Sequence, residues 1–560
     1  MKEARESANA LHNGDVDDAI RAYDDITGAE LSPRLMKQAR RSEMEYFRKM
    51  RVYSKVPTAE CYAATGKPPI GVRWVDINKG DDNSPQYRSR LVAQEFKKQS
   101  DGEGMFAETP PIEILKLLIS VMTRKKNYQL MTADVSRAYF YAPVTRPVYV
   151  KLIEEDQGED DHDKCGKLHV SMYGTRDAAF NWAGHLAEQM GKIGFKNLRC
   201  SSCLYYHKEK DIRVMIHGDD YVAVAGKIEL DWLSARLKEQ FECKVTRLGN
   251  NAGEVDELRI LNRYVRLVDE GVEYEPDLRH AELIIRDLQL EVAKSVSTPG
   301  ESTMTDLPDD DELLDKQGHT KYRSIVARAN FLAIDRADIQ QATQELSKNM
   351  SAPTKRDWRK LKRLGRYLSG AKRVVLKYEW REQEDGITGW TDSNWGGDTK
   401  SRKSTSGGAI MWGPHQIKSW CRGQKVIALS SAEAELYAAV KASTETMGML
   451  AVMREWGIEI EGTIRADASA ALGIIERSGV GRVMHLDISH LWIQEAALKK
   501  TLRYKKVPGE INAADLMTKA VPYEIMRRHM ETLSVEVREG RSKSAVRLQQ
   551  SLSPWKGRSN

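Results

Sequence analysis

The sequence predicts an α+β fold, because short strand-like segments alternate along it with amphipathic helical segments. Residues 212–216 and 221–225 are rich in apolar and β-branched side chains and are too short for helices, so both are expected to be strands. Apolar residues recur at helical spacing in 112–122 and in 276–288, which indicates helices with one buried face. Strands and helices arranged around one central hairpin therefore predict a sheet with helices packed on it.

Length and composition indicate a globular protein of several domains. The 560 residues suffice for about three or four domains of ordinary size. The net charge is +6, so local clusters of basic residues matter more than the total. No apolar run is long enough to span a bilayer, and MKEARESANALHNG lacks the apolar core of a signal peptide, so no membrane partner is expected. Six cysteines in so long a chain indicate a reducing, intracellular compartment, and the single CxxC at Cys200 and Cys203 lacks a second ligand pair at zinc-site spacing.

The central hairpin carries His217-Gly218-Asp219-Asp220. Gly218 supplies the backbone freedom that a tight turn requires. Adjacent carboxylates at the tip repel one another, and a bound divalent cation would remove that cost. Carboxylate oxygens are hard ligands that suit Mg²⁺ or Mn²⁺. By itself the pattern also fits an exposed turn with two solvated aspartates.

A third carboxylate fits the same centre. Residues 128–135 are expected to form a strand with Asp134 near its end, and Tyr139 follows five residues later. Two-metal nucleotidyl transfer requires cations about 3.5–4 Å apart, and therefore carboxylates that converge from separate strands. Asp134, Asp219 and Asp220 satisfy that requirement and predict a metal-dependent nucleotidyl-transfer site.

Acidic residues recur at strand–helix junctions in the last third of the chain. Two expected strands end at Asp392 and Asp467, and two expected helices begin near Glu435 and Asp515. Residues 426–429 are expected to form a further strand. Loops at such junctions are where a rigid scaffold presents catalytic groups, so a second acidic site is predicted here.

The region 322–376 is expected to be helical, and its second half is strongly basic. Between residues 355 and 373 there are nine Lys and Arg side chains against one acid, Asp357. One interpretation is a solvated helix face. The other is a track for phosphate backbones, where each Lys or Arg contact releases counterions. The residues expected to form that track are Arg359, Lys360, Arg363 and Arg366.

The order of these segments resembles the Pol protein of a copia-type LTR retrotransposon. In the first part the matching blocks are KPPIGVRWV (67–75), YRSRLVAQEF (87–96), LMTADVSRAYFYAPV (130–144), SMYGTRDAAFNW (171–182), HGDDYVAVAG (217–226), VSTPG (296–300), YRSIVARANFLA (322–333) and APTKRDWRKLKRLGRYLSG (352–370). The later blocks, WTDSNWGGD (390–398), ALSSAEAELYAA (428–439), RADASAALGI (465–474), MHLDISHLWIQE (484–495) and NAADLMTKA (512–520), resemble the ribonuclease H module of these elements.

The resemblance implies reverse-transcriptase fingers and palm, a helical connection, and an RNase H-like α/β domain with a mixed sheet. The expected division is a weakly ordered segment 1–35, fingers and palm 36–300, a linker and thumb-like helical connection 301–385, the RNase H-like domain 386–522 and a basic tail 523–560. It also implies that RNA template, DNA primer, RNA–DNA hybrid and dNTPs are partners, in a cytoplasmic particle or the nucleus. The oligomeric state, including a homo-oligomer, stays open.

The resemblance also assigns residues, with two Mg²⁺ or Mn²⁺ ions per active site. The polymerase ligands would be Asp134, Asp219 and Asp220, and the hydrolytic ligands Asp392, Glu435, Asp467 and Asp515, with Glu433 as a competing neighbour of Glu435. Tyr139 would pack under the incoming sugar and exclude a 2′-hydroxyl, Gly174 would lie near the nucleotide, and Arg88 and Arg90 would contact its triphosphate.

Three departures from the family pattern leave alternatives open. His217-Gly218 stands where Tyr-Val is usual, Ala179 replaces a proline and Ala468 replaces an asparagine. No metal ligand is lost. The first hypothesis is therefore RNA- and DNA-templated DNA synthesis with degradation of RNA in the hybrid. A catalytically impaired remnant that only binds nucleic acid, and a chain that retains only the nuclease, are the alternatives.

Overall fold

A computed structural model describes residues 22–25, 29–80, 85–96, 108–382, 386–479, 481, 485 and 487–545. Most of the expected weakly ordered segment 1–35 lies outside the described residues, as does the end of the expected tail, 546–560. Within the described residues, none of the helices combines the length and apolar character needed to span a membrane.

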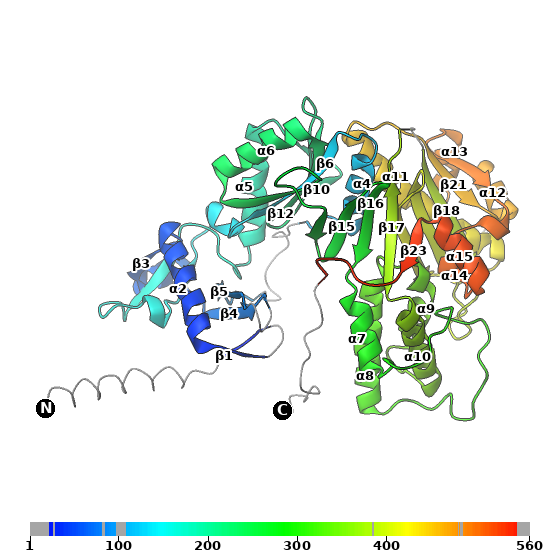
Figure 1. The fold of residues 1–560 in the computed structure, drawn as a ribbon, viewed down its shortest axis with the longest axis horizontal. Helices are drawn as coiled ribbons and strands as arrows, with labels where there is room; N and C mark the ends of the chain where they lie inside the picture. Colours follow the sequence, from blue (N-terminus) through cyan, green and yellow to red (C-terminus); the bar gives the residue numbers. More distant parts are fainter. Residues whose placement is uncertain are drawn as a thin grey trace.

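A six-stranded antiparallel sheet holds the predicted hairpin. Its order is β13 (Cys243–Leu248), β6 (Tyr128–Val135), β12 (Asp220–Gly226), β11 (Ile212–His217), β10 (Ser201–His207) and β9 (Lys196–Leu198). Side chains along β12 alternate between two cores, as the strand period requires. Val222 and Val224 pack with α4 (Ile112–Met122), whereas Ala223 and Ala225 pack with α5 (Ala178–Lys192) and α6 (Lys227–Gln240). The sheet is thus covered by helices on both faces (Figure 1).

A smaller lobe packs beside the end of this sheet. It contains α2 (Pro33–Lys49), α3 (Thr58–Thr65), the hairpin of β4 (Val72–Asn78) and β5 (Tyr87–Ala93), and the sheet β3 (Tyr53–Pro57), β8 (Lys164–Leu168) and β7 (Tyr149–Val150). A short pair, β1 (Ala22–Tyr23) and β2 (Glu30–Leu31), precedes it. Phe47, Leu91 and Phe140 share one buried cluster, and Phe140 lies just beyond β6. This cluster therefore connects the lobe to the strand that carries Asp134 (Figure 1).

A second antiparallel sheet contains strands from three of the segments into which the sequence was divided. Its order is β14 (Glu257–Ile260), β15 (Arg263–Val268), β16 (Gly271–Pro276), β17 (Arg373–Glu379) and β23 (Val535–Arg538). Because β16 pairs with β17 and β17 pairs with β23, the expected boundary at residue 300 does not separate two packing units. The expected tail from residue 523 is also wrong for its first part, which forms α15 (Tyr523–Thr532) and β23.

The expected helical region 322–376 is three helices followed by a strand. The helices are α8 (Lys316–Ala333), α9 (Ala337–Lys348) and α10 (Lys355–Gly370), and they pack with α7 (Arg279–Asp287) below the second sheet (Figure 1). The segment from residue 373 is a strand because Val374, Val375, Leu376 and Tyr378 are all buried between neighbouring elements. Its β-branched residues favour that state over a helix.

The last part of the chain contains a mixed sheet. Its order is β20 (His415–Gly423), β19 (Thr405–Trp412), β18 (Ile387–Asn394), β21 (Gly462–Ala466) and β22 (Arg503–Lys506). β18 is antiparallel to β19 and parallel to β21, and α11 (Ser431–Glu455) packs across them. Helices α12 (Ser469–Glu476), α13 (Trp492–Leu498) and α14 (Asp515–Thr518) complete it. The predicted α+β class with a mixed sheet is confirmed, whereas the strand expected at 426–429 is absent from its described residues.

One continuous core joins the two halves of the molecule through α4. Ser120 Oγ lies 2.9 Å from His415 Nδ1, and Tyr378 donates to the Gln416 carbonyl at 2.7 Å. Burial, together with the nearby Arg381, lowers the pKa of His415 to about 3, so its ring is neutral in this contact.

An ion network is buried in the same core. Lys116 Nζ lies 2.9 Å from Asp335 Oδ1, and both side chains are 2% exposed. Arg263 donates to the other oxygen at 2.9 Å and Tyr274 donates to Oδ1 at 2.7 Å. Burial opposes ionisation of Asp335, but Lys116 and Arg263 outweigh it and lower its pKa.

Replacing Lys116 by Met should lower the free energy of unfolding by about 3 kcal/mol, because it leaves a buried carboxylate under-compensated. The measurement is urea unfolding followed by tryptophan fluorescence. The control, Arg236→Met, removes an exposed pair with Glu239 and should cost less than about 1 kcal/mol. Equal losses for the two variants would contradict a structural role for the buried network.

Candidate metal centres

The first centre lies where β6 meets the β11–β12 hairpin. His217 pairs with Asp220, so Gly218 and Asp219 form a two-residue turn, and Gly218 has φ of 66°. Asp220 lies directly opposite Asp134 on β6. Antiparallel pairing therefore brings all three predicted carboxylates to one end of the sheet. Trp182 of α5 donates its indole N–H to the Gly218 carbonyl at 2.8 Å, which holds the tip of the hairpin in place.

The acids of this centre repel one another. Burial, followed by the charges of Asp219 and Asp134, raises the pKa of Asp220 to about 6. His217 and Lys79 act in the opposite direction. At neutral pH the centre therefore concentrates negative charge that a divalent cation would neutralise.

Cationic side chains of the small lobe face these acids. Arg88 and Arg90 lie on β5, as predicted, and Lys79 lies in the loop that follows β4. Burial and the repulsion of Arg88 and Arg90 lower the pKa of Lys79, whereas Asp134 and Asp219 act to raise it. Lys79 therefore lies with Arg88 and Arg90 among the cations that face the acids of the β11–β12 hairpin. The sequence did not single it out, because only the closure of the β4–β5 hairpin brings this lysine to the centre.

Tyr139 lies between the acids and the small lobe. It belongs to the short 3₁₀ helix η1 (Ala138–Tyr141), and its ring centroid is 4.8 Å from that of Tyr173. The guanidinium of Arg90 lies 4.6 Å from the centroid of the Tyr173 ring. Burial, followed by the nearby Asp219, raises the pKa of Tyr139. Tyr139 and Tyr173 thus place two aromatic rings beside the acids of the first centre.

Gly174 has a packing reason for being glycine. Its φ is 83°, and a Cβ atom there would lie 2.0 Å from the Ala93 carbonyl oxygen at the end of β5. A side chain would therefore displace the strand that carries Arg88 and Arg90. This packing explains the glycine without a nucleotide, so the nucleotide contact at Gly174 stays a prediction.

The second centre is compact. β18 and β21 are parallel neighbours, so their carboxyl ends meet at one edge of the mixed sheet. Asp392 on β18, Glu435 on α11 and Asp467 after β21 have carboxylate oxygens within 4.8 Å of one another. Among the described residues, these three acids meet the 4.8 Å limit, whereas the group of Asp134, Asp219 and Asp220 does not.

Hydrogen bonds orient two of these three acids. Glu435 Oε1 accepts from the backbone N–H of Ser393 at 3.2 Å and from its hydroxyl at 2.9 Å. Its Oε2 is buried with no hydrogen-bond partner among the described residues. Thr518 donates to Asp392. An unpartnered buried carboxylate oxygen beside two other acids fits the ligand set of a divalent cation.

The acids of the second centre hold protons tightly. Burial, followed by the charge of Asp392, raises the pKa of Glu435 to about 8. Burial also raises the pKa of Asp392 to about 7, although Lys519 opposes the shift. Shifts of this kind are frequent at functional sites, because carboxylates are crowded there in the absence of a neutralising ligand.

Glu433 is separated from the centre by its own contacts. It accepts from the backbone N–H of Leu429 at 2.8 Å and from the hydroxyl of Tyr437 at 2.6 Å, and its Oε2 lies 2.9 Å from His485 Nε2. Glu433 therefore closes the first turn of α11, and Glu435 is the acid of this helix that reaches the cluster.

The fourth predicted acid is held beside the cluster by a lysine. Lys519 Nζ lies 2.8 Å from Asp515 Oδ1 and 3.3 Å from Asp392 Oδ2. Asp515 is not within the compact group of three. Asp515 and Lys519 are four residues apart at α14, a spacing that permits such pairs, but the sequence did not show that Lys519 would bridge two of the acids.

The predicted phosphate track on α10 is largely occupied by the chain itself. Arg359 pairs with the buried Asp310 at 2.5 Å, and Arg363 pairs with Glu301 at 2.9 Å. Arg366 donates to the Lys294 carbonyl at 2.8 Å. Because acids and carbonyls of the preceding segment engage these cations, the helix does not present four free charges. Among the described residues, Lys360 is the predicted member for which neither an ion pair nor a side-chain hydrogen bond is found.

Comparison with known proteins agrees with the arrangement at the first centre. A family model for reverse transcriptase (RNA-dependent DNA polymerase) matches residues 61–251, which span the small-lobe hairpin, β6 and β12. The chain is 26% identical over 514 residues to the retrovirus-related Pol polyprotein from transposon TNT 1-94 of Nicotiana tabacum. The chain is thus a relative of copia-type retrotransposon Pol polyproteins. The predicted resemblance is confirmed.

The match covers 87% of this chain but 37% of the tobacco protein. A second Pol polyprotein, from transposon RE2 of Arabidopsis thaliana, is 26% identical over 465 residues, which cover 80% of this chain and 31% of that protein. This Pol relative therefore spans about a third of the length of the curated proteins that it matches.

Two solved structures resemble the fold only distantly. A foamy viral protease–reverse transcriptase in complex with an RNA/DNA hybrid has a TM-score of 0.43 and 10% identity, over 98% of this chain and 63% of that chain. The foamy viral protease–reverse transcriptase dRH in complex with double-stranded DNA has a TM-score of 0.44 and 11% identity, over 84% of this chain and 69% of that chain. Neither likeness is close enough to transfer ligands to this Pol relative.

Binding of Mn²⁺ at the second centre should strengthen as the pH rises from about 6 to about 8, by up to about a hundredfold per pH unit at the acid end of this range, because protons compete for both Asp392 and Glu435. Electron paramagnetic resonance of free Mn²⁺ would measure it, in an Asp219→Asn, Asp220→Asn background that removes two acids of the first centre. Glu435→Gln should bind weakly throughout this range, whereas the exposed control Glu524→Gln should not change the profile. Affinity independent of pH would contradict the assignment.

Proposed function

We propose that the first centre catalyses templated DNA synthesis on RNA and DNA templates and that the second hydrolyses the RNA strand of the RNA–DNA hybrid. The observation that supports the first activity most strongly is the register that sets Asp220 opposite Asp134 beneath a group of small-lobe cations. The compact cluster of Asp392, Glu435 and Asp467 supports the second.

Synthesis requires that a primer hydroxyl and a dNTP be held together. Asp134, Asp219 and Asp220 would hold two Mg²⁺ or Mn²⁺ ions, which when bound activate the attacking hydroxyl and stabilise the leaving pyrophosphate. Arg88, with Lys79 and Arg90 beside it, would bind the triphosphate charge. Tyr139, fixed against Tyr173, would form the surface beneath the sugar and exclude a 2′-hydroxyl by contact.

Hydrolysis requires that the cleaved strand be oriented at the second cluster. Asp392, Glu435 and Asp467 would hold the divalent ions, which when bound activate water and neutralise the phosphodiester. Lys519, paired with both Asp515 and Asp392, would hold these two acids in place. The ribose 2′-hydroxyl is the group that would distinguish the RNA strand from DNA.

The alternative of an impaired remnant rests in part on the departure at His217-Gly218. The hairpin around this pair keeps a two-residue turn and the pairing of β11 with β12 and of β12 with β6. Gly218 also supplies the carbonyl that Trp182 binds. The departure from the family pattern is thus accommodated locally, which supports activity over loss of function.

Primer extension tests the first activity. The intact protein should extend a DNA primer on an RNA template with Mg²⁺ or Mn²⁺, and Asp219→Asn should reduce the rate by about 10³-fold or more, because it removes a metal-binding charge. The exposed acid Glu239, on α6, provides the control Glu239→Gln, which should extend at the parent rate. No extension by the parent protein, or equal extension by Asp219→Asn, would contradict the assignment.

Cleavage of a labelled hybrid tests the second activity separately. Asp392→Asn should abolish cleavage while primer extension continues, because the two centres use different strands and helices. Asp219→Asn should show the converse. Loss of both activities in the Asp392→Asn variant, with its fold confirmed by circular dichroism, would contradict two separate centres.

A further inference from the structure

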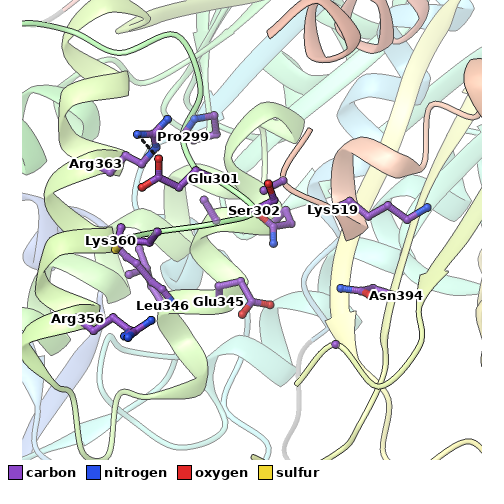
Figure 2. A pocket seen from close by; sticks show the side chains of 16 residues that line it. Pro299, Glu301, Ser302, Glu345, Leu346, Arg356, Lys360, Arg363, Asn394 and Lys519 are labelled. Atoms are coloured by element: carbon purple, nitrogen blue, oxygen red, sulfur yellow. Dashed lines mark ion pairs between the residues drawn. The ribbon is translucent and has the colours of Figure 1, made fainter. Parts of the chain in front are cut away.

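A cavity lies between α10 and the edge of the mixed sheet that holds the second centre. Its volume is about 410 Å³, and its walls include Arg356, Lys360 and Arg363 of α10, Glu301 of the preceding segment, and Asn394 and Lys519. Figure 2 shows the α10 side chains on one side and Asn394 and Lys519 on the other. The cavity thus separates the basic helix from the hydrolytic cluster.

Two residues connect this cavity to the cluster. The ammonium group of Lys519 is directed away from the α10 wall (Figure 2), and it lies 3.3 Å from Asp392 and 2.8 Å from Asp515. Asn394 follows Asp392 by two residues on β18, and the side-chain amide of Asn394 points toward the cavity. A strand rises about 3.3 Å per residue, so Asn394 lies about 7 Å further along the chain than the metal-binding acid.

The acidic segment before α8 removes most of the positive charge from the α10 wall. Arg363 pairs with Glu301 at 2.9 Å, the dashed contact of Figure 2. Arg356 pairs with Asp306 and lies 3.2 Å from Asp310. Lys360, one turn from each arginine, has no ion pair within the described residues. It is therefore the cation of this wall whose charge is left for a ligand.

We propose that this cavity binds the sugar-phosphate backbone of the RNA strand next to the phosphodiester held at the second centre. Lys360 contacts a phosphate and the Asn394 amide donates to the same backbone, while the acidic segment 301–312 confines the strand to the cavity by neutralising the arginines beside it. The proposal rests on the hydrolytic function proposed above. It replaces the four-residue track on α10 by one positioned lysine.

The chemistry of the walls favours a phosphodiester. A lysine ammonium is a point charge suited to a single phosphate oxygen, and an amide N–H₂ adds neutral donors. The acids that line the cavity are already engaged, Glu301 by Arg363 and Glu345 by Lys348 at 2.5 Å. Within the described part of the chain, a ligand would therefore meet the unpaired Lys360 beside neutralised ion pairs, an arrangement that favours a singly charged group at a defined place.

Binding of a hybrid in Ca²⁺, without Mg²⁺ or Mn²⁺, tests the proposal independently of catalysis. Fluorescence anisotropy over a KCl series should show that Lys360→Gln lowers affinity about 5- to 20-fold and reduces the slope of log K against log salt by about 1. Lys362→Gln, the same change at an exposed position of α10 outside the cavity, is the matched control and should leave both quantities near the parent values.

A second variant tests the role of the acidic segment. Asp306→Asn frees Arg356 from one partner and should raise the affinity and the salt slope, since another cation becomes available. Equal behaviour of the Lys360→Gln and Lys362→Gln variants, or weaker binding by Asp306→Asn, would overturn the proposal.

A neutral linkage locates the contact on the strand. Hybrids carry one 2′-O-methyl methylphosphonate at successive positions of the RNA strand, and one position should weaken binding of the parent protein but not of Lys360→Gln. If the parent protein is sensitive to the linkage at that position and Lys360→Gln is not, the result supports the binding site. This holds even if the parent protein cleaves no hybrid, an outcome that would refute the hydrolytic function but not the binding site. Equal sensitivity of the parent and Lys360→Gln at every position would overturn the site.

Discussion

The pairing register between β12 and β6 is the constraint on which the first centre depends. A shift of one residue would turn every side chain of β12 to the opposite face of the sheet. Val222 and Val224 fill the core shared with α4, whereas Ala223 and Ala225 fit beneath α5 and α6. Because both faces are packed by different helices, the register is strongly specified, and with it the position of Asp220 opposite Asp134.

Both centres hold acids in surroundings that disfavour their charge, and the compensating cations come from distant segments. At the first centre they come from the β4–β5 hairpin of the small lobe, which no local sequence pattern connects to Asp134. At the second centre Lys519, which directly follows α14, pairs with Asp392 and Asp515. The fold therefore brings charge of opposite sign to acids that local structure has already grouped.

Local patterns were sufficient to predict the strands and helices that carry the acids. The hairpin strands expected at 212–216 and 221–225 are observed at Ile212–His217 and Asp220–Gly226, and the helix at 112–122 has the expected bounds. Periodicity and turn residues act over a few positions, so these elements are accessible from sequence. The resemblance favoured Glu435 over Glu433, and the structure adds the physical reason, which is that Leu429, Tyr437 and His485 engage Glu433.

Long-range strand pairing explains why two segments were predicted wrongly from sequence. β17 pairs with β23 across more than a hundred residues, so neither the end of the expected helical region nor the start of the expected tail was recognisable as a strand. The segment 426–429 has the composition of a strand, yet its Val426, Ile427 and Leu429 are exposed and no neighbour pairs with them among the described strands. The basic face of α10 was ambiguous for a related reason, since sequence does not show whether phosphate or a nearby carboxylate neutralises an arginine.

Anomalous diffraction from crystals soaked in Mn²⁺ would show directly whether the two separated groups of acids bind metal. We expect anomalous density at two places, one beside Asp134, Asp219 and Asp220 and one among Asp392, Glu435 and Asp467, in crystals that also contain primer, template and a dNTP. Mn²⁺ at the second place with none at the hairpin in such crystals would contradict it, because the polymerase centre would then lack the cations that its chemistry requires.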